Sequence, residues 1–382
     1  VSAILDKLLK GQKVEWLPLG KVCEIADNLR KPVKSSLRIA GNIPYYGANN
    51  IQDYVEGYTH NGQYVLIAED GSASLENYSI QWADGKFWAN NHVHVIKGKE
   101  NLNNRFLYHF LKYMNFIPYL TGGDRAKLTK AKMVEILIPI PPLDVQAEIV
   151  RILDAFTAVT AELTAELTAE LNMREKQYQY YRDKLLSFSD SEIIWKNLDE
   201  IANFMNGKGH EKDIHEFGEY IVVNSKFISS DGQVAKYTNN QICPLYNDDI
   251  LIVMSDLPNG KALAKTFFVE EDNKYSLNQR IGRLSAKDKS QVLPKFLYYF
   301  LNRNSQLTKF DNGTDQTNLR KDQILGVKIP IISVERQKRI VEILDKFETL
   351  THSITEGLPK EITLREQQYE YYREQLLDFP KN

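Results

Sequence analysis

The side chains in this sequence that could do chemistry are basic and amide groups gathered in short stretches, a pattern that suits recognition better than catalysis. Arg, Lys, Asn and Gln side chains donate hydrogen bonds to nucleic-acid base edges and phosphates. In the first half they gather in RKPVKSSLR (30–38), YYGANN (45–50) and GGDRAKLTK (122–130). A solvated charge run, a turn formed by Gly47 and the neighbouring Asn residues, and a helix N-cap loop are the simpler interpretations of these three stretches. The candidate DNA-contacting residues are Lys31, Lys34, Arg38, Tyr45, Tyr46, Asn49, Asn50, Arg125, Lys127 and Lys130.

The second half carries its own polar stretches, in NSK (224–226), NQR (278–280) and NGTDQTNLRK (312–321). The last of these occupies the position that GGDRAKLTK occupies in the first half, with a different set of polar side chains. Different side chains at equivalent positions of the two halves suit two different DNA specificities. The two equivalent stretches, 122–130 and 312–321, are therefore the strongest candidate site. A capped helix start and a surface strand end are the alternatives. The candidates here are Lys226, Asn278, Gln279, Arg280, Gln316, Asn318 and Arg320.

The sequence lacks the patterns of a catalytic or cofactor-binding protein. It contains no GxxxxGK[ST] phosphate loop and no Gly-rich nucleotide-binding turn. Its two cysteines lie far apart, and His92 and His94 alternate as strand decoration without a third ligand. We therefore expect no catalytic residue, no metal and no cofactor. No segment is apolar enough to span a membrane and no signal peptide opens the chain, so a cytoplasmic protein is expected.

Length and charge predict at least two soluble domains and leave a nucleic-acid partner possible. The chain has 382 residues and a formal net charge of −2. Acidic residues concentrate in 146–190 and 334–382, whereas 1–145 is slightly basic. A slightly basic first segment permits nucleic-acid binding but does not demand it.

The chain is a tandem duplication. REKQYQYYRDKLLSF (174–188) returns as REQQYEYYREQLLDF (365–379), and IVRILDAF (149–156) returns as IVEILDKF (340–347), both at an offset of 191 residues. Gln146 and Gln337 share that offset, and each half begins near a Trp. The repeat predicts one fold used twice, as segment, helix, segment, helix. DKLL at 6–9 also repeats DKLL at 183–186, so the N-terminal residues are expected to pack beside the end of the second helix.

The repeated helical segments carry matching apolar stripes. A heptad pattern with four-residue stutters runs along both, and TAELTAELTAEL (160–171) extends the first. These patterns predict two long helices that pack on each other in antiparallel directions, with an interruption near Gly357 and Pro359. Each TAEL would lengthen its helix by about 6 Å. The residues expected at partner-docking surfaces are Gln146, Tyr178, Tyr181, Gln337, Tyr369 and Tyr372. The tyrosines also resemble a base-stacking set, but their helical spacing favours positions in the helix core and at a partner-docking surface.

Two junction sequences resemble those of a known protein family. LTKAKMVEILIPIPPLDVQAEIVRILDAF (128–156) and LRKDQILGVKIPIISVERQKRIVEILDKF (319–347) look like the domain-to-helix junctions of the DNA specificity subunits of type I restriction–modification systems. IPYYGANN (43–50), DDILIV (248–253) and the TAEL repeats are similar to further parts of that family. The second junction departs from the first, with IPIIS in place of IPIPPL.

The resemblance implies an α+β protein with two mixed α/β target-recognition domains, held apart by two antiparallel helices. The expected divisions are 1–145 and 191–335 for the domains, and 146–190 and 336–382 for the helices. Each domain would read one half of a split double-stranded DNA sequence, and the helices would set the gap. The subunit would be non-catalytic and would recruit methyltransferase subunits for modification and ATP-dependent nuclease subunits for restriction. A two-headed scaffold that binds protein partners is the alternative.

Overall fold

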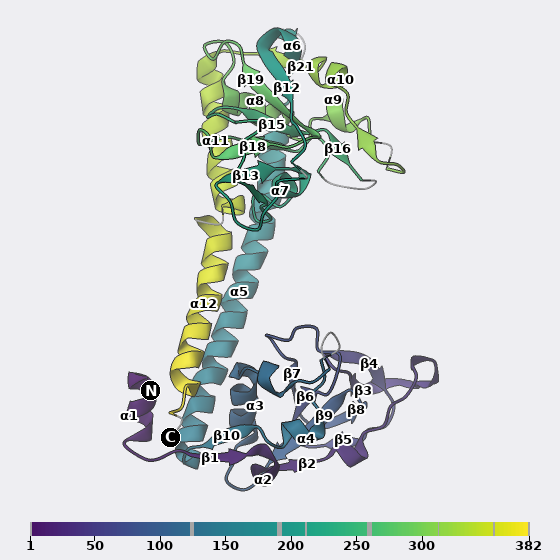
Figure 1. Ribbon diagram of the computed structural model, residues 1–382, viewed down its shortest axis with the longest axis vertical. Coiled ribbons are helices and arrows are strands. Elements are labelled where there is room, and N and C mark those ends of the chain that lie inside the picture. The colour runs from purple at the N-terminus through teal and green to yellow at the C-terminus, as the bar shows by residue number, and fades with distance from the viewer. Residues whose placement is uncertain are drawn as a thin grey trace. The chain divides into compact units, whose positions relative to one another are not determined.

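The protein divides into two compact units, each with its own sheets and core. The computed structural model describes residues 2–122, 126–188, 193–210, 212–257, 262–311, 313–353 and 356–380. Unit 1 is Val1–Glu166 with Thr363–Asn382, and unit 2 is Leu167–Ile362 (Figure 1). Both mix helices and strands, and the long helix α5 (Leu143–Leu185) contributes residues to each. The expected α+β class with duplicated mixed domains is confirmed.

Both units contain a four-stranded antiparallel sheet with equivalent strand order. The order is β2-β9-β6-β7 in unit 1 and β12-β19-β15-β17 in unit 2. The central strands read YVLIA and ILIV, uninterrupted apolar runs typical of a strand that is covered on both faces. The strands are β2 (Cys23–Ile25), β6 (Tyr64–Ala68), β7 (Ile80–Ala83), β9 (Val93–Gly98), β12 (Ala202–Asn206), β15 (Ile250–Val253), β17 (Thr266–Phe268) and β19 (Ile281–Ala286).

Alternate side chains of these central strands enter two different cores. In unit 1, Val65 and Ile67 belong to the core that contains helix α3 (Asn104–Tyr113), whereas Leu66 belongs to the core on the other side. In unit 2, Ile250 and Ile252 likewise join the core of α8 (Pro294–Leu301), and Leu251 joins the opposite one. Each sheet is therefore a middle layer with a hydrophobic core on both faces.

A second sheet covers the far side of that layer and differs more between the units. Unit 1 has the order β4-β3-β8-β5 and unit 2 has β14-β13-β18. One parallel pair is common to both, β3 with β8 and β13 with β18. The strands are β3 (Ala40–Tyr46), β4 (Ile51–Val55), β5 (His60–Asn61), β8 (Lys86–Ala89), β13 (Tyr220–Val223), β14 (Tyr237–Thr238) and β18 (Tyr275–Leu277).

Short elements join each sheet layer to its helices, again in matching pairs. Trp16 of β1 (Glu15–Pro18) pairs with Pro139 of β10 (Leu137–Ile140), and Trp195 of β11 (Ile194–Asn197) pairs with Pro330 of β21 (Lys328–Ile331). The other short elements are α2 (Leu19–Val22), α4 (Lys130–Met133), α6 (Leu198–Ile201), α7 (Ser225–Ser229), α9 (Ser305–Thr308), α10 (Lys321–Leu325), β16 (Ser255–Asp256), β20 (Thr317–Asn318) and the 3-10 turns η1 (Asp27–Leu29), η2 (Ser35–Leu37) and η3 (Ile117–Tyr119).

Within each unit the long helices pack in opposite directions, as expected. In unit 1 the ring of Phe156 stacks on Tyr372 of α12 (Gly357–Leu377) at 4.8 Å, and the Thr157 hydroxyl donates to the Tyr369 hydroxyl over 3.1 Å. In unit 2 the ring of Tyr181 stacks at 5.6 Å on Phe347, which lies on α11 (Val334–His352).

The expected interruption of the second helical segment is confirmed at the junction of α11 and α12. Gly357 has φ +77°, a conformation that favours glycine, and a Cβ there would lie 2.5 Å from the Thr349 carbonyl oxygen. Pro359 lies in the first turn of α12, where its missing N–H breaks no hydrogen bond of the helix. The glycine therefore marks the break, and the proline belongs to the new start.

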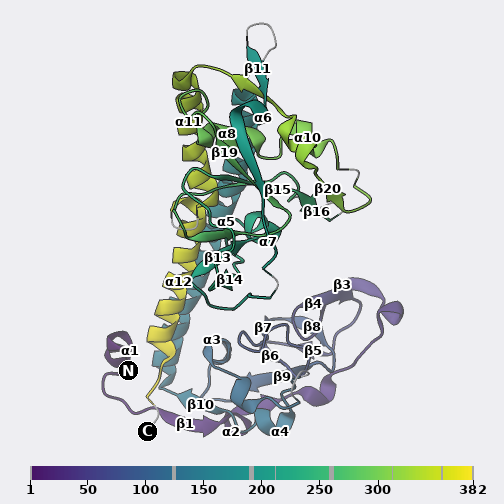
Figure 2. The same cartoon turned by 45° about the horizontal axis from the view of Figure 1, so that its top comes forward.

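The N-terminal helix α1 (Ala3–Leu9) packs beside the end of α12, as the DKLL echo predicts. Leu5 and Leu9 share a core with Leu376 and Leu377, and α1 lies next to the end of α12 in Figures 1 and 2. The ring of Phe379 meets Phe106 edge-on at 5.9 Å. The corresponding pair in unit 2 is Phe188 and Phe296, at 6.4 Å. The end of α12 thus packs into the core of unit 1, and the end of α5 packs into the core of unit 2 in the same way. Among the described residues, no helix combines the length and apolar character needed to cross a membrane.

Candidate nucleic-acid interface

Three segments meet in unit 1 where the buried strand β6 ends. The backbone N–H of Glu69 donates to the His92 carbonyl over 2.8 Å, and the N–H of Leu128 donates to the Glu69 carbonyl over 2.8 Å. Asp70 forms an isolated β-bridge with Lys127. Residues 69–71, 90–92 and 126–128, widely separated in the sequence, therefore form one location, which we call the strand-end site of unit 1.

Unit 2 contains the same location with different side chains. The N–H of Met254 donates to the Arg280 carbonyl over 2.9 Å, and the N–H of Leu319 donates to the Met254 carbonyl over 2.7 Å. Ser255 pairs with Asn318. The strand register agrees, because Ala68 faces Val93 as Val253 faces Ile281. His92 and Arg280 are thus equivalent, as are Asp70 and Ser255, and Lys127 and Asn318.

Charged groups in the unit 1 site largely pair with one another. Nδ1 of His92 lies 2.5 Å from Oδ1 of Asp70. Nζ of Lys127 lies 3.6 Å from Glu69 and 3.8 Å from Asp70, and Arg30 reaches Glu69 at 2.8 Å. The carboxylates give this site hydrogen-bond acceptors, which suit exposed amino groups such as those of cytosine or adenine.

Buried polar groups support the backbone of the strand-end site of unit 1. Both ring nitrogens of His94 face acceptors, the Asp27 carboxylate at 2.7 Å and the Leu128 carbonyl at 2.9 Å. Burial opposes ionisation of Asp27, but hydrogen bonds from His94 and from the Val95 N–H outweigh it and lower the pKa of that carboxyl. His94 therefore serves as a structural support, and no group of three potential metal ligands occurs in the described part of the chain.

The loop 47–50 joins this site through Asn49. Its Nδ2 donates to the Gly71 carbonyl over 2.8 Å, and its Oδ1 accepts from the Ala73 N–H over 2.8 Å. Asn50 and Lys130 are exposed nearby along the chain. Arg125 lies outside the described residues. Of the first-half candidates, the structure brings Asn49 and Lys127 together around the end of β6.

In unit 2 the structure unites two candidate stretches that the sequence keeps apart. Gln316 donates from Nε2 to the Ser255 hydroxyl over 2.8 Å, and Asn318 is exposed on β20. Arg280 lies on the other side of the same strand end, through its carbonyl bond to Met254. Asn278 is half-buried, with Oδ1 3.4 Å from Nδ1 of His210. Three further candidates are exposed: Lys226, Gln279 and Arg320, the last 3.3 Å from Asp322.

One predicted contact residue is corrected by its burial. The side chain of Tyr45 is 1% exposed, stacks on Trp88 and accepts the Val33 N–H with its hydroxyl over 3.0 Å. It cannot reach a base, because it fastens the 31–38 loop to the sheet. Arg38 covers its ring at 4.1 Å and lies 3.4 Å from Asp53, so it serves the same loop.

The remaining candidates near this loop differ in exposure. Lys31 and Lys34 are exposed and available to phosphates. Tyr46 is half-buried edge-on to Phe87, and burial raises the pKa of its hydroxyl. These placements leave the two lysines as the contact candidates of this loop.

Three expected partner-contact residues are likewise corrected. Gln146 and Gln337 are completely buried. Gln146 accepts from the Asn103 N–H over 2.8 Å and donates to the Asn101 and Pro141 carbonyls, so its amide is fully used within unit 1. Gln337 makes the matching three bonds in unit 2. Tyr178 is 4% exposed in the unit 2 core, whereas Tyr181, Tyr369 and Tyr372 keep partly exposed surfaces.

The sequence analysis did not identify His92 as part of the strand-end site, although the sequence contained a pattern that could have shown it. ANNHV (89–93) and LNQRI (277–281) occupy the same strand positions, since Asn90 donates its N–H to Tyr46 and Asn278 donates its N–H to Val223. The shared pattern is an apolar residue, Asn, an amide, a cationic or titratable side chain, and a β-branched residue. Aligning the two halves on β9 and β19 would have found it.

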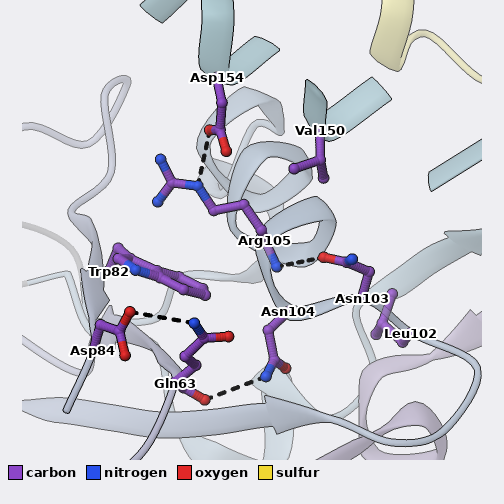
Figure 3. A pocket seen from close by; sticks show the side chains of 9 residues that line it. All are labelled: Gln63, Trp82, Asp84, Leu102, Asn103, Asn104, Arg105, Val150 and Asp154. Atoms are coloured by element: carbon purple, nitrogen blue, oxygen red, sulfur yellow. Dashed lines mark hydrogen bonds and ion pairs between the residues drawn. The ribbon is translucent and has the colours of Figure 1, made fainter. Parts of the chain in front are cut away.

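A surface pocket of about 550 Å³ lies where α3 meets α5 in unit 1 (Figure 3). Arg105 crosses it, with its guanidinium 5.0 Å from the Trp82 ring and Nε 2.9 Å from Oδ1 of Asp154. Asn104 donates to the Gln63 carbonyl over 3.3 Å along the floor. These side chains bind one another and so link β7, α3 and α5 within unit 1.

The fold is a duplicated α+β unit, and each copy carries an equivalent strand-end site with different polar side chains. The type I restriction–modification DNA specificity domain matches residues 12–173 and again 192–364. A putative type I restriction enzyme specificity subunit of Haemophilus influenzae is 52% identical over 98% of both chains. The EcoR124I/EcoR124II specificity subunit of Escherichia coli is 34% identical, over 99% of this chain and 97% of its own.

Solved structures agree with the fold. The S subunit of a type I restriction–modification system from M. genitalium has a TM-score of 0.51 at 17% identity, over 97% of both chains. A chain from a structure described as the basis of complex assembly and conformational transition of the type I system has a TM-score of 0.55 at 15% identity, over 96% of this chain and 98% of its own. The protein therefore belongs to the family of type I restriction–modification DNA specificity subunits and contains two copies of that family's DNA specificity domain.

Proposed function

We propose that this chain recognises a split double-stranded DNA sequence, with each unit reading one half through its strand-end site. One observation carries the proposal: the same backbone location recurs in both units with unlike side chains. Asp70, His92 and Lys127 occupy it in unit 1, and Ser255, Arg280 and Asn318 occupy it in unit 2. A shared scaffold with exchanged polar groups is what two different half-sites require.

Exposed cations elsewhere on the two units would supply affinity without sequence preference. Lys31, Lys34 and Lys130 in unit 1, and Lys226 and Arg320 in unit 2, are exposed. Contacts from such groups to phosphates release counterions, so binding should weaken steeply as salt rises. This division assigns affinity mainly to the lysine-bearing loops and sequence preference to the strand-end sites.

We propose further that the helices set the unspecified gap between the half-sites. α5 is continuous over Leu143–Leu185 and includes all three TAEL repeats, so its length is fixed by the number of residues. Helix length would then translate into base pairs, which follow one another about every 3.4 Å along the duplex.

The chain would act in the cytoplasm as the DNA-reading part of a larger assembly. Methyltransferase subunits and ATP-dependent nuclease subunits would perform the reactions, and the exposed helical tyrosines Tyr180, Tyr181 and Tyr371 are candidate contacts for them. The E. coli relative is the specificity subunit of a type I restriction enzyme, which supports this division of labour.

Selection from a pool of random duplexes, with and without modification subunits, tests the function. We expect enrichment of a two-part motif with a gap of constant length, and salt-dependent binding in a gel-shift assay. Failure to enrich any sequence under both conditions would favour the alternative, a two-headed scaffold for protein partners.

A further inference from the structure

Arg280 lies at a turn whose backbone is held in an unusual conformation. Its φ is +66°, in the left-handed region that an arginine rarely adopts. Hydrogen bonds fix the turn on both sides: the Asn278 N–H donates to the Val223 carbonyl, and the Met254 N–H donates to the Arg280 carbonyl. Ile281, the next residue, pairs with Val253 in the central sheet. A glycine would fit this backbone with less strain, so an arginine here points to a use for its side chain.

The Arg280 side chain is available for a ligand. It is exposed, and no hydrogen bond, ion pair or ring contact of its guanidinium occurs within the described part of the chain. The equivalent His92 instead lies 2.5 Å from the Asp70 carboxylate. Unit 2 has Ser255 where unit 1 has Asp70, so the corresponding position offers Arg280 no carboxylate.

The amides beside Arg280 extend this surface. Gln316 is anchored to the Ser255 hydroxyl at 2.8 Å, and Asn318 pairs with Ser255 through the backbone. Arginine donates two parallel hydrogen bonds to O6 and N7 of guanine, whereas glutamine and asparagine match adenine. A rigid turn that presents a guanidinium beside amides suits base edges better than phosphates, which any mobile lysine can contact.

We propose that Arg280 reads a guanine through its major-groove edge, and that this contact specifies one position of the half-site read by unit 2. The inference rests on the proposed function and deepens it, because it names the base and the residue. It also predicts that the half-site of unit 1 does not depend on Arg280, since His92 and Asp70 occupy the equivalent positions there.

The first test compares the motifs enriched from random duplexes by wild-type chain and variants, each with the modification subunits. Arg280→Gly suits the backbone and removes the guanidinium, and Arg280→Lys keeps the charge without the paired donors. We expect both to lose discrimination at one guanine, in one half-site only, by roughly 10-fold or more. The other half-site and the gap should stay unchanged.

The second test probes the base atom. Duplexes with 7-deazaguanine at single positions lack the N7 acceptor and should bind wild-type chain several-fold more weakly at one guanine. Arg280→Gly should not respond to the same replacement. A response that is equal in wild type and variant at every guanine would overturn the proposal.

One control variant and two contrary outcomes separate this inference from the proposed function. Arg303 is another arginine at positive φ, +51°, in unit 2, so Arg303→Gly matches the loss of charge and the change in backbone preference. It should leave the motif intact. If Arg280→Gly weakens binding to all sequences equally and reduces the salt dependence of binding, Arg280 contacts a phosphate. The inference about guanine then fails, while the proposed function stands. If the wild-type chain enriches no split motif, the proposed function fails and the inference fails with it.

Discussion

Nε of Arg105 lies 2.9 Å from Oδ1 of Asp154, and the repeat reproduces this pair as Lys295 and Asp345, with Nζ 3.3 Å from Oδ1. A second donor accompanies each pair. His109 donates to Asp154 over 2.8 Å, and Tyr299 donates to Asp345 over 2.6 Å. Asp154 on α5 and Asp345 on α11 thus each bind one cation and one buried hydrogen-bond donor. Both groups come from the shorter helix that packs on the long one, α3 or α8. The repeat conserves the geometry while exchanging the donors.

Replacement of Asp154 should therefore loosen the joint between α3 and α5. Asp154→Ala leaves the buried His109 nitrogen without its acceptor and removes the partner of Arg105, at a cost of about 1–3 kcal/mol. Urea unfolding followed by tryptophan fluorescence measures the loss. Glu148→Ala on the same helix is the control, since its partner Arg151 is largely exposed, and it should change stability far less. Equal losses would contradict the assignment.

The stability of unit 1 should fall in mild acid because of His109. Burial lowers its pKa below the usual 6.5, although the hydrogen bond to Asp154 opposes the shift. The folded chain keeps this ring neutral while the unfolded chain takes up a proton, so stability present at neutral pH is lost as pH falls below about 6.5. The urea midpoint at pH 7.5 and pH 5.5 measures this.

The His109→Gln variant isolates that contribution. It keeps a donor near Asp154 but cannot take up a proton, so the loss between the two pH values should shrink. His60, whose pKa burial also lowers, should retain part of the acid sensitivity in this variant. An unchanged pH response in His109→Gln would show that other groups cause it.

Gln146 should be a stability residue rather than a contact residue. Gln146→Met keeps the side-chain volume but leaves the Asn103 N–H and two carbonyls without partners, at a cost on the order of 3 kcal/mol. Gln337→Met should cost a similar amount in unit 2. Chemical denaturation measures both, and Gln179→Met, on the exposed face of α5, is the matched control. A stable Gln146→Met chain that fails to bind modification subunits would restore the original interpretation.

Removal of one TAEL should change the gap and nothing else in the recognised sequence. Deleting 160–163 takes out four helical residues of α5, about 6 Å of rise and roughly 40° beyond a full turn. Sequencing of the methylated or enriched motif should then show a shorter gap between unchanged half-sites. Changing Thr160 to Ala, without deletion, should leave the gap as it was. Altered half-sites with the original gap would refute the measuring role of the helix.

The sequence by itself determined the duplication, the helices and their interruption. These follow from local signals: an offset of 191 residues, apolar periodicity, and the residues Gly357 and Pro359 within the second helical segment. The N-terminal echo was also enough to place α1 beside the end of α12. Such features depend on residues that are close in the sequence or on repetition within the sequence. They can therefore be predicted without knowing which distant residues are in contact.

Only the tertiary structure decided which polar residues gather at the two strand-end sites. Glu69, His92 and Leu128 meet through backbone hydrogen bonds that join three distant segments, and Met254, Arg280 and Leu319 repeat them. Burial is likewise a property of the packed whole, because Tyr45 and Gln146 carry polar groups that the core satisfies internally. A side chain's type states which bonds it can make. Its neighbours after folding decide whether those bonds are already used.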